Sequence, residues 1–413
     1  MKEQDKEQKL QKKRKIYFVS LGASFGLLLL FGLIFFFTSD DRRNFLNRYS
    51  LSDRVDIADS DLFSYYFRIA NQAYLEGKLE EASKNLSKII VKKLSPHQEY
   101  MFHLLNSCVF RDRQLFYKSL EEIDEAIKIR PTAFAFFLKA KILQDLDKET
   151  EMIAALTKAA EVDPSFRASH EKLGDFFFAK GDLTKAKDYY QQAEQNSIPL
   201  ASINIKMSLI DFYYGLYENS INRLEGLGGV EKNRYLPFIY FLIGMNQYSL
   251  KNFEEYDKSL ERAVGSSTTD ERVAYLYYWA KLSNQRNDFQ KAISLFKQAF
   301  IIAGEDHPFS VNLLMDLSRV SFKQGQYREA IKYTQMIYDK NPKLLGDNFY
   351  YQMGVSYYKM GEYPNAQRFL KWVVDNSSND ELLKSSTYLL AQSYYKDNDL
   401  QKARSTLSSF SES

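Results

Sequence analysis

The side chains best suited to catalysis or metal binding are few and widely spaced in this 413-residue sequence. It holds four histidines and a single cysteine, Cys108. His97 and His103 are six residues apart, a spacing that does not place them on one face of a helix. A single cysteine excludes an intramolecular disulfide, a thiolate zinc site and an iron–sulfur cluster. We therefore predict no metal site and no cofactor.

Motifs for nucleotide binding or nucleophilic catalysis are also missing from the sequence. It contains no P-loop, no dinucleotide glycine fingerprint, no His-Glu-x-x-His and no nucleophile elbow. The run Gly226-Leu227-Gly228-Gly229 superficially resembles a phosphate-binding loop, but it does not follow a predicted strand. We expect His170 in the core or at its rim, and Cys108 as a small buried apolar side chain. The sequence thus predicts no catalytic residue and no enzymatic activity.

The composition is that of a folded, helical chain. Hydrophobic residues make up 45% and charged residues 26%, which argues against disorder. Only 17 glycines and 8 prolines argue against an all-β fold, which needs many turns. The basic tail, residues 1–15, carries seven Lys/Arg and three acidic residues, so the rest of the chain is nearly neutral although the net charge is +3. A nearly neutral chain lacks the excess of positive charge that nucleic-acid binding requires.

Residues 16–38 form the one long apolar segment, with 23 residues and no charge. At about 1.5 Å per residue, a helix of this length crosses a hydrocarbon core of about 30 Å. The segment ends in three phenylalanines without a small-x-small cleavage site, which favours an uncleaved anchor over a cleaved leader. A buried core helix is a weaker alternative because no comparable segment recurs. The lack of a nearby cysteine excludes a lipid-anchored lipoprotein.

The charges beside this segment predict its orientation. Because the basic tail precedes it, the positive-inside rule places the N-terminus in the cytoplasm. We expect a single-pass protein of the cytoplasmic membrane, with residues 39–62 as a polar spacer. The remaining chain would lie outside, in the periplasm if the source is bacterial.

A repeated pattern of glycine, aromatic or leucine, and alanine follows the spacer. It is clearest at residues 77–82, 181–186, 325–330 and 361–366. The glycine can end a first helix because it tolerates the left-handed conformation. The alanine lets a second helix pack closely, and a proline can follow where the second helix ends. The pattern therefore predicts pairs of helices joined by short turns.

On these motifs the chain resembles the tetratricopeptide repeat (TPR) family, whose unit is a 34-residue helix–turn–helix. The small residue after each turn falls at Ala82, Ser119, Met152, Ala186, Ser220, Tyr256, Ala292, Ala330, Ala366 and Ala403. Ten repeats, numbered 1 to 10, then start near residues 63, 100, 133, 167, 201, 237, 273, 311, 347 and 384. The resemblance is strong in repeats 1, 4, 8 and 9, fair in 6, 7 and 10, and poor in 2, 3 and 5.

The resemblance implies an all-α, right-handed superhelical solenoid of about ten repeats over residues 63–413. The first helix of each repeat (helix A) would line a concave groove, and each repeat would bury its apolar face only against its neighbours. The glycine run at 226–229 lies between repeats 5 and 6, as a flexible joint or an ordinary loop. No polar capping helix follows repeat 10, so either its second helix is polar enough or a partner covers it.

Positions 5 and 12 of helix A face the groove in this family, and most of them are aromatic here. The candidate groove residues are Phe67, Tyr74, Phe137, Phe178, Phe212, Phe241, Tyr248, Tyr277, Phe322, Tyr351, Tyr358, Tyr388 and Tyr395. Position 9 adds Lys141, Lys281 and Arg319. The rings could form a partly exposed ladder for an apolar or helical segment of a partner. Alternatively, they pack between adjacent helices.

A C-terminal carboxylate is not the expected ligand. Some members of the family hold one with a clamp of Lys, Asn and Arg. The matching places in this sequence hold Phe67, Asn71, Leu104 and Phe137.

Two functions agree with these features. The first is a membrane-anchored scaffold that holds other envelope proteins, and a narrower version of it is a collar scaffold of periplasmic flagella. The second is an accessory chaperone or regulator that binds unfolded or unassembled clients transiently. An enzyme is disfavoured because the anchor, the spacer and the repeats leave no room for a catalytic domain.

Overall fold

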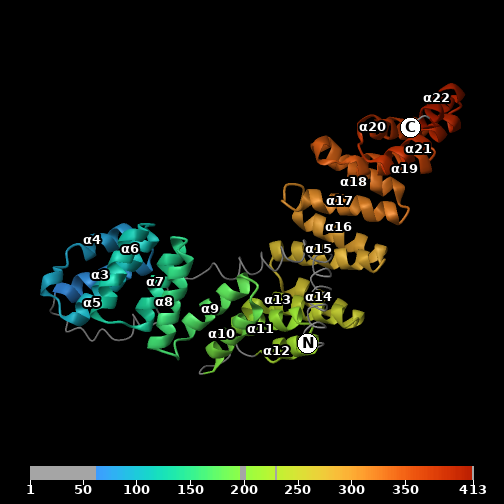
Figure 1. Cartoon of the computed structure of the whole chain (residues 1–413). Coiled ribbons are helices and arrows are strands. Elements are labelled where there is room, and N and C mark those ends of the chain that lie inside the picture. The colour runs from blue at the N-terminus through green and yellow to red at the C-terminus, as the bar shows by residue number, and fades with distance from the viewer. Residues whose placement is uncertain (1–61, 196–200, 228–229, 412–413) are drawn as a thin grey trace, which may run out of the picture. The chain divides into compact units, whose positions relative to one another are not determined.

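The computed structural model describes residues 62–195, 201–227 and 230–411 (Figure 1). Within these ranges the regular secondary structure is helical, without strands. The predicted basic tail, the predicted transmembrane helix at 16–38 and nearly all of the predicted spacer lie outside the described residues. Among the helices that are described, none combines the length and apolar character needed to span a membrane.

Twenty α-helices form ten pairs in this part of the chain. The helices A are α3 (Leu62–Leu75), α5 (Pro96–Asp112), α7 (Ala133–Asp145), α9 (Arg167–Ala179), α11 (Ala201–Tyr213), α13 (Val230–Ser249), α15 (Thr269–Gln285), α17 (Ser310–Lys323), α19 (Asp347–Lys359) and α21 (Asp380–Lys396). The second helices (helices B) are α4 (Leu79–Leu86), α6 (Phe116–Ile129), α8 (Glu149–Val162), α10 (Leu183–Glu194), α12 (Tyr217–Glu225), α14 (Phe253–Ser266), α16 (Phe289–Ala303), α18 (Tyr327–Lys340), α20 (Tyr363–Asn376) and α22 (Leu400–Ser411). Two short 3₁₀ helices, η1 (Val91–Lys93) and η2 (Pro342–Leu344), precede α5 and α19.

The predicted helix pairs are confirmed in number for the described residues. Four helices A begin at the predicted residue, namely those at 133, 167, 201 and 347. The largest difference is α13, which begins at Val230 rather than near residue 237. Pro237 lies inside this helix, although proline is favoured only in the first turn.

The chain divides into two compact parts, residues 1–231 (the N-terminal block) and 232–413 (the C-terminal block). Within each block, every helix B packs against helix A of the next repeat. This stacking is the order expected of a solenoid, in which each repeat contacts its neighbours. The predicted right-handed superhelix over the whole chain stays a prediction.

All ten turns between helices A and B share one backbone conformation. The residue five positions before the small residue has a positive φ in every repeat: Gly77, Gln114, Asp147, Gly181, Gly215, Lys251, Asn287, Gly325, Gly361 and Asn398. Half of these residues are not glycine, and the left-handed conformation costs such residues about 1–2 kcal/mol. The turn is therefore kept even where the glycine of the sequence pattern is lost.

Close contact between helices A and B depends on glycine in three repeats. A Cβ atom added at Gly174 would lie 2.5 Å from the Tyr190 ring. A Cβ at Gly354 would lie 2.6 Å from Cγ of Leu370, and Gly244 approaches Leu260 in the same way. These glycines are therefore packing residues in the middle of helices, where glycine otherwise costs stability.

We expect Gly354→Ala to lower the free energy of unfolding of the C-terminal block by about 2 kcal/mol, because the added methyl overpacks the contact with Leu370. Denaturant unfolding followed by tryptophan fluorescence measures this, since Trp279 and Trp372 both lie in this block. The matched control is Gly265→Ala in α14, where an added Cβ meets nothing within 4 Å. That change should be neutral or should stabilise by about 0.5 kcal/mol. Equal effects of the two variants would contradict the packing argument.

Candidate protein-binding site

Four of the predicted groove rings are buried in the core. Phe67, Tyr74, Phe137 and Phe241 are at most 4% exposed, so a partner cannot reach them in this structure. Phe137 packs edge-on against Phe166, which lies just before the next helix A. Phe241 in α13 lies 5.3 Å from Tyr275 of α15, measured between ring centroids. In this structure these four rings are therefore core residues, against their prediction as accessible groove residues.

Most of the rings at position 12 pack against the start of helix B in their own repeat. Phe178, Phe212, Tyr248, Phe322 and Tyr358 are half-buried. Four of them pack edge-on against the first aromatic residue of helix B, with centroid distances of 5.5 Å for Phe212–Tyr217, 5.7 Å for Tyr248–Phe253, 5.9 Å for Phe322–Tyr327 and 5.9 Å for Tyr358–Tyr363. Such pairs stabilise a fold by about 0.5–1.5 kcal/mol beyond area burial. This geometry favours the packing interpretation for these rings.

The remaining aromatic candidates lie on helices A of the C-terminal block. Tyr277 and Tyr351 are half-buried, whereas Tyr388 is 53% and Tyr395 is 61% exposed. We call these four rings, together with Lys281 and Arg319, the C-terminal A-helix face.

Side-chain contacts connect the four helices that carry this face. The Tyr277 hydroxyl of α15 donates a hydrogen bond of 3.0 Å to Oδ2 of Asp316 in α17. The Arg319 guanidinium of α17 lies 4.8 Å from the ring centroid of Phe349 in α19. The Tyr358 hydroxyl of α19 donates to Oε1 of Gln392 in α21 over 3.1 Å. Each of these helices A is therefore linked by a side-chain contact to the next one.

A positively charged centre lies within this face. Lys281 Nζ is 3.4 Å from Oδ2 of Asp316, and Arg319 Nη1 is 3.4 Å from its Oδ1. One nearly buried carboxylate therefore faces two cations, and the Arg319 side chain is 49% exposed. Burial and the neighbouring Asp316 raise the pKa of Tyr277, so its hydroxyl stays protonated. Lys141, the third predicted groove cation, is instead only 8% exposed in α7.

In the N-terminal block, the same positions of the repeat carry charges of the opposite sign. Asp175 corresponds to Lys281, and Lys206 corresponds to Asp316. Lys206 of α11 is 1% exposed, and its Nζ lies 3.0 Å from Glu171 and 2.6 Å from Asp175, both in α9. The Tyr190 hydroxyl donates a hydrogen bond of 2.8 Å to Asp175. Burial opposes the charge on Lys206, but Asp175 and Glu171 outweigh it and raise the pKa of Lys206. This cluster is a closed structural network, unlike the exposed cations of the C-terminal block.

The other residues considered in the sequence analysis lie in surroundings that indicate a structural role. His170 is buried, with Nε2 3.0 Å from the Pro164 carbonyl oxygen, as predicted for a core histidine. Burial raises the pKa of the Cys108 thiol to about 12, so it is a poor nucleophile. Over residues 62–195, 201–227 and 230–411, no group of three or more His, Cys, Asp or Glu side chains could hold a metal ion. The loop residue Gly226 is the C-cap of α12, and Gly228 and Gly229 lie outside the described residues.

Sequence reasoning missed Asp316, Asp175 and Lys206. The signal was present: Lys206 follows Glu171 by 35 residues and Asp316 follows Lys281 by 35 residues. Opposite charges one repeat apart, on helices A, predict contact between neighbouring repeats.

Comparison with known proteins supports the repeat assignment. Models of the tetratricopeptide repeat family match residues 135–166 and 151–200. Residues 135–200 therefore match tetratricopeptide repeats. The first match falls on repeat 3, where we expected a poor resemblance, and that expectation was wrong. In this repeat Asp147 adopts the left-handed turn conformation without a glycine.

Solved structures that this chain matches include proteins from several bacteria. The C-terminal part of a TPR repeat-containing protein from Cytophaga hutchinsonii has 14% identity and a TM-score of 0.48, covering 60% of this chain and 99% of its own. A tetratricopeptide repeat protein from Parabacteroides merdae has 11% identity and a TM-score of 0.42, covering 63% and 98%. PilF from Pseudomonas aeruginosa has 13% identity and a TM-score of 0.41, covering 50% and 93%. A search of curated proteins found no match.

Proposed function

We propose that this protein is a non-catalytic scaffold that binds other proteins through the C-terminal A-helix face. The observation that carries the proposal is the row of accessible rings and cations on α15, α17, α19 and α21, with Tyr388 and Tyr395 more than half exposed. Exposed aromatic and arginine side chains are typical anchors of protein interfaces. The tetratricopeptide repeats found at residues 135–200 agree with a binding role rather than a catalytic one.

The cellular setting is part of the proposal and depends on sequence alone. The apolar segment at 16–38 would anchor the chain in the cytoplasmic membrane, with the basic tail inside. The repeats would then meet envelope proteins on the outer side of the membrane. The collar of periplasmic flagella is a narrower version, which the identity of the partner would test.

We expect the double change Tyr388→Ser and Tyr395→Ser to reduce capture of the main partner at least about tenfold, because it removes the two most accessible anchors of the face. The measurement is a crosslinked pull-down of the full-length protein from native membranes, with partners identified and quantified by mass spectrometry. The matched control is Tyr65→Ser with Tyr117→Ser, two tyrosines of α3 and α6 that are 52% and 66% exposed but lie off this face. Both variants must keep the helical circular dichroism and melting temperature of the wild type.

Three results are distinguishable in this experiment. Loss of one stoichiometric envelope partner, in the first variant alone, supports the scaffold. Weak, salt-insensitive capture of many unfolded chains would instead indicate the chaperone. Retention of every partner by the first variant would reject this face as the binding surface and leave its rings with a packing role.

A further inference from the structure

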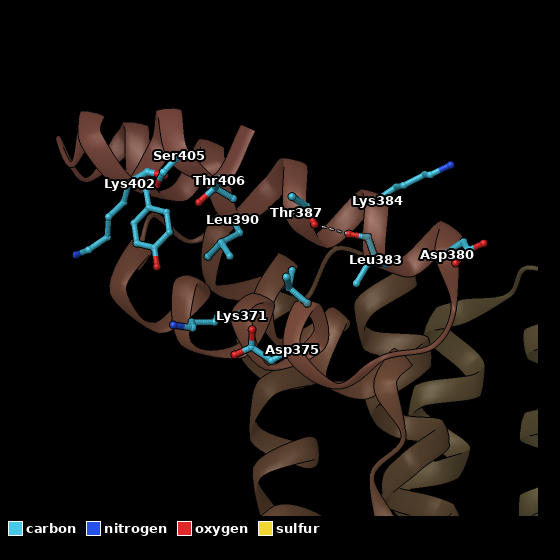
Figure 2. A pocket seen from close by; sticks show the side chains of 12 residues that line it. Lys371, Asp375, Asp380, Leu383, Lys384, Thr387, Leu390, Lys402, Ser405 and Thr406 are labelled. Carbon is cyan, nitrogen blue, oxygen red and sulfur yellow. Dashed lines mark hydrogen bonds between the residues drawn. The ribbon is translucent and has the colours of Figure 1, made fainter. Parts of the chain in front are cut away.

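The C-terminal block contains a cavity of about 640 Å³ between α20, α21 and α22 (Figure 2). Its lining is mixed: Val374, Leu383 and Leu390 are apolar, and lysines and aspartates lie at its edge. Tyr388 and Tyr395 of the C-terminal A-helix face are not among the lining residues. A volume of this size is within the range of pockets that bind ligands, about 300–1,000 Å³.

Four aromatic rings occupy the corresponding place one repeat earlier, between α18, α19 and α20. Tyr350 stacks on Trp372 with 3.7 Å between centroids, and it lies 6.4 Å from both Tyr338 and Phe369. Tyr350 and Phe369 are buried. These rings fill the space between the helices B α18 and α20 and the helix A α19.

Smaller side chains replace those rings around the cavity. Repeats 8, 9 and 10 can be aligned on the small residue of each helix B, which is Ala330, Ala366 or Ala403. In this register Val374 takes the place of Tyr338, Thr387 that of Tyr350, and Thr406 that of Phe369. All three replacements line the cavity. The cavity therefore exists because repeat 10 lacks aromatic volume that repeat 9 has.

One ring of the earlier cluster is retained in the cavity wall. Tyr357 stacks on Phe369 with centroids 5.6 Å apart and planes inclined by 5°. Its counterpart, Tyr394, lines the cavity, but Thr406 stands where the stacking partner would be. Lys402 Nζ lies over one face of the Tyr394 ring, 5.5 Å from its centroid. A ring that borders missing aromatic volume suits an aromatic guest, because offset-stacked rings attract one another.

The charges at the edge do not favour an anionic or a cationic guest. Lys371 and Lys384 are accompanied by Asp375 and Asp380 in the lining. Lys402, the remaining cation, forms an ion pair with Asp399, with Nζ and Oδ2 2.7 Å apart. The edge is therefore close to electrically balanced and can offer hydrogen bonds to a peptide backbone.

We propose that this cavity is a binding site for a single aromatic side chain of a partner protein, held by its peptide backbone at the edge. The guest ring takes the place that Tyr350 and Phe369 fill one repeat earlier and stacks on Tyr394. The site is separate from the C-terminal A-helix face, so its failure leaves the proposed function intact.

The test uses the full-length protein and a neutral probe, acetyl-Gly-(5-fluoro-Trp)-Gly-amide, followed by ligand-observed fluorine NMR. We expect a Kd below about 1 mM, and at least about tenfold weaker competition by the matching alanine peptide. The variant Thr387→Tyr with Thr406→Phe restores two of the missing rings and should weaken probe binding at least about tenfold. Its melting temperature is measured beside that of the wild type.

Two controls keep this test decisive. Thr157→Tyr adds a ring at an exposed position of α8 and should leave probe binding unchanged. If the double variant loses helical circular dichroism, Thr387→Tyr alone fills part of the cavity and must still weaken binding. Equal affinity for the filled variant and the wild type would overturn the proposal, as would no binding at probe concentrations of several millimolar.

Discussion

Replacing Lys206 with alanine is expected to lower the stability of the N-terminal block by about 3 kcal/mol, at the low end for breaking a buried ion pair. The Lys206 side chain is 1% exposed and is shared by Glu171 and Asp175. Removal of the Lys206 side chain leaves the carboxylates of Glu171 and Asp175 close together without the ammonium group that contacts both. It also leaves a void beside α11. Because the carboxylates are 20% and 28% exposed, water relieves part of the penalty. Native-state hydrogen exchange of the amides of α9 and α11 measures this loss locally, which suits a repeat array that need not unfold in one step.

Two further variants separate the charge from the volume. Lys206→Met keeps most of the buried volume and should lose less stability than Lys206→Ala. Lys158→Ala removes an exposed partner of Glu161 and should change stability by less than about 0.5 kcal/mol. If Lys206→Ala were as mild as Lys158→Ala, the buried network would contribute nothing to the fold.

The same cluster predicts how stability depends on pH. Burial opposes ionisation of Glu171, but Lys206 outweighs it, so the pKa of Glu171 is lowered in the folded protein. Its contribution to stability is therefore present above the unfolded pKa of about 4.3 and is lost as pH falls through the lower folded value. The pKa of Lys206 is raised, so its contribution is lost only as pH rises beyond about 10.4. Lys206→Ala should remove the loss of stability above about pH 10.4. It should also reverse the acid dependence in the exchange of α9, because burial, no longer opposed by Lys206, then raises the pKa of Glu171.

The repeat architecture was predictable because its determinants are local. A turn residue in the left-handed conformation recurs in all ten repeats, and a small residue follows it by five positions in eight of them, Met152 and Tyr256 being the exceptions. Repeats 2, 3 and 5 were judged poor matches because the turn glycine or the small residue is lost. In repeats 2 and 3, Gln114 and Asp147 stand where glycine is expected. In the structure both residues adopt the same left-handed turn conformation as the glycines. The cost of a left-handed side chain is smaller than the packing energy of a helix pair.

The candidate site was less predictable because exposure depends on the next repeat. Position 5 holds Phe241 in repeat 6 and Tyr388 in repeat 10, with the same helical register, yet one is 1% and the other 53% exposed. The difference comes from Tyr275 of the following helix A, which covers Phe241. Likewise, the cavity near Thr387 becomes visible only when repeat 10 is compared with repeat 9. Single-repeat reasoning cannot detect either feature.

Replacing Phe241 with alanine should therefore lower the free energy of unfolding of the C-terminal block by about 3–4 kcal/mol, through lost burial and the cavity that remains. Its ring centroid lies 5.3 Å from that of Tyr275 and 6.4 Å from those of Phe238 and Tyr278, so several aromatic contacts are lost together. Denaturant unfolding followed by the fluorescence of Trp279 and Trp372 measures the change.

The matched control for Phe241 is Tyr388→Ala, which removes a ring from the same repeat position at a place where it is 53% exposed. That variant should lose less than about 1 kcal/mol, because most of its ring remains in contact with water in the folded state. In the pull-down, Tyr388→Ala should reduce partner capture at unchanged melting temperature, whereas any loss caused by Phe241→Ala should follow its loss of folded protein. A Phe241→Ala protein that is fully stable would mean that the ring is not part of the core. A stable variant that also lost the partner would return Phe241 to the binding surface. The pair of variants thus separates recognition from packing at one repeat position, which the aromatic pattern alone leaves ambiguous.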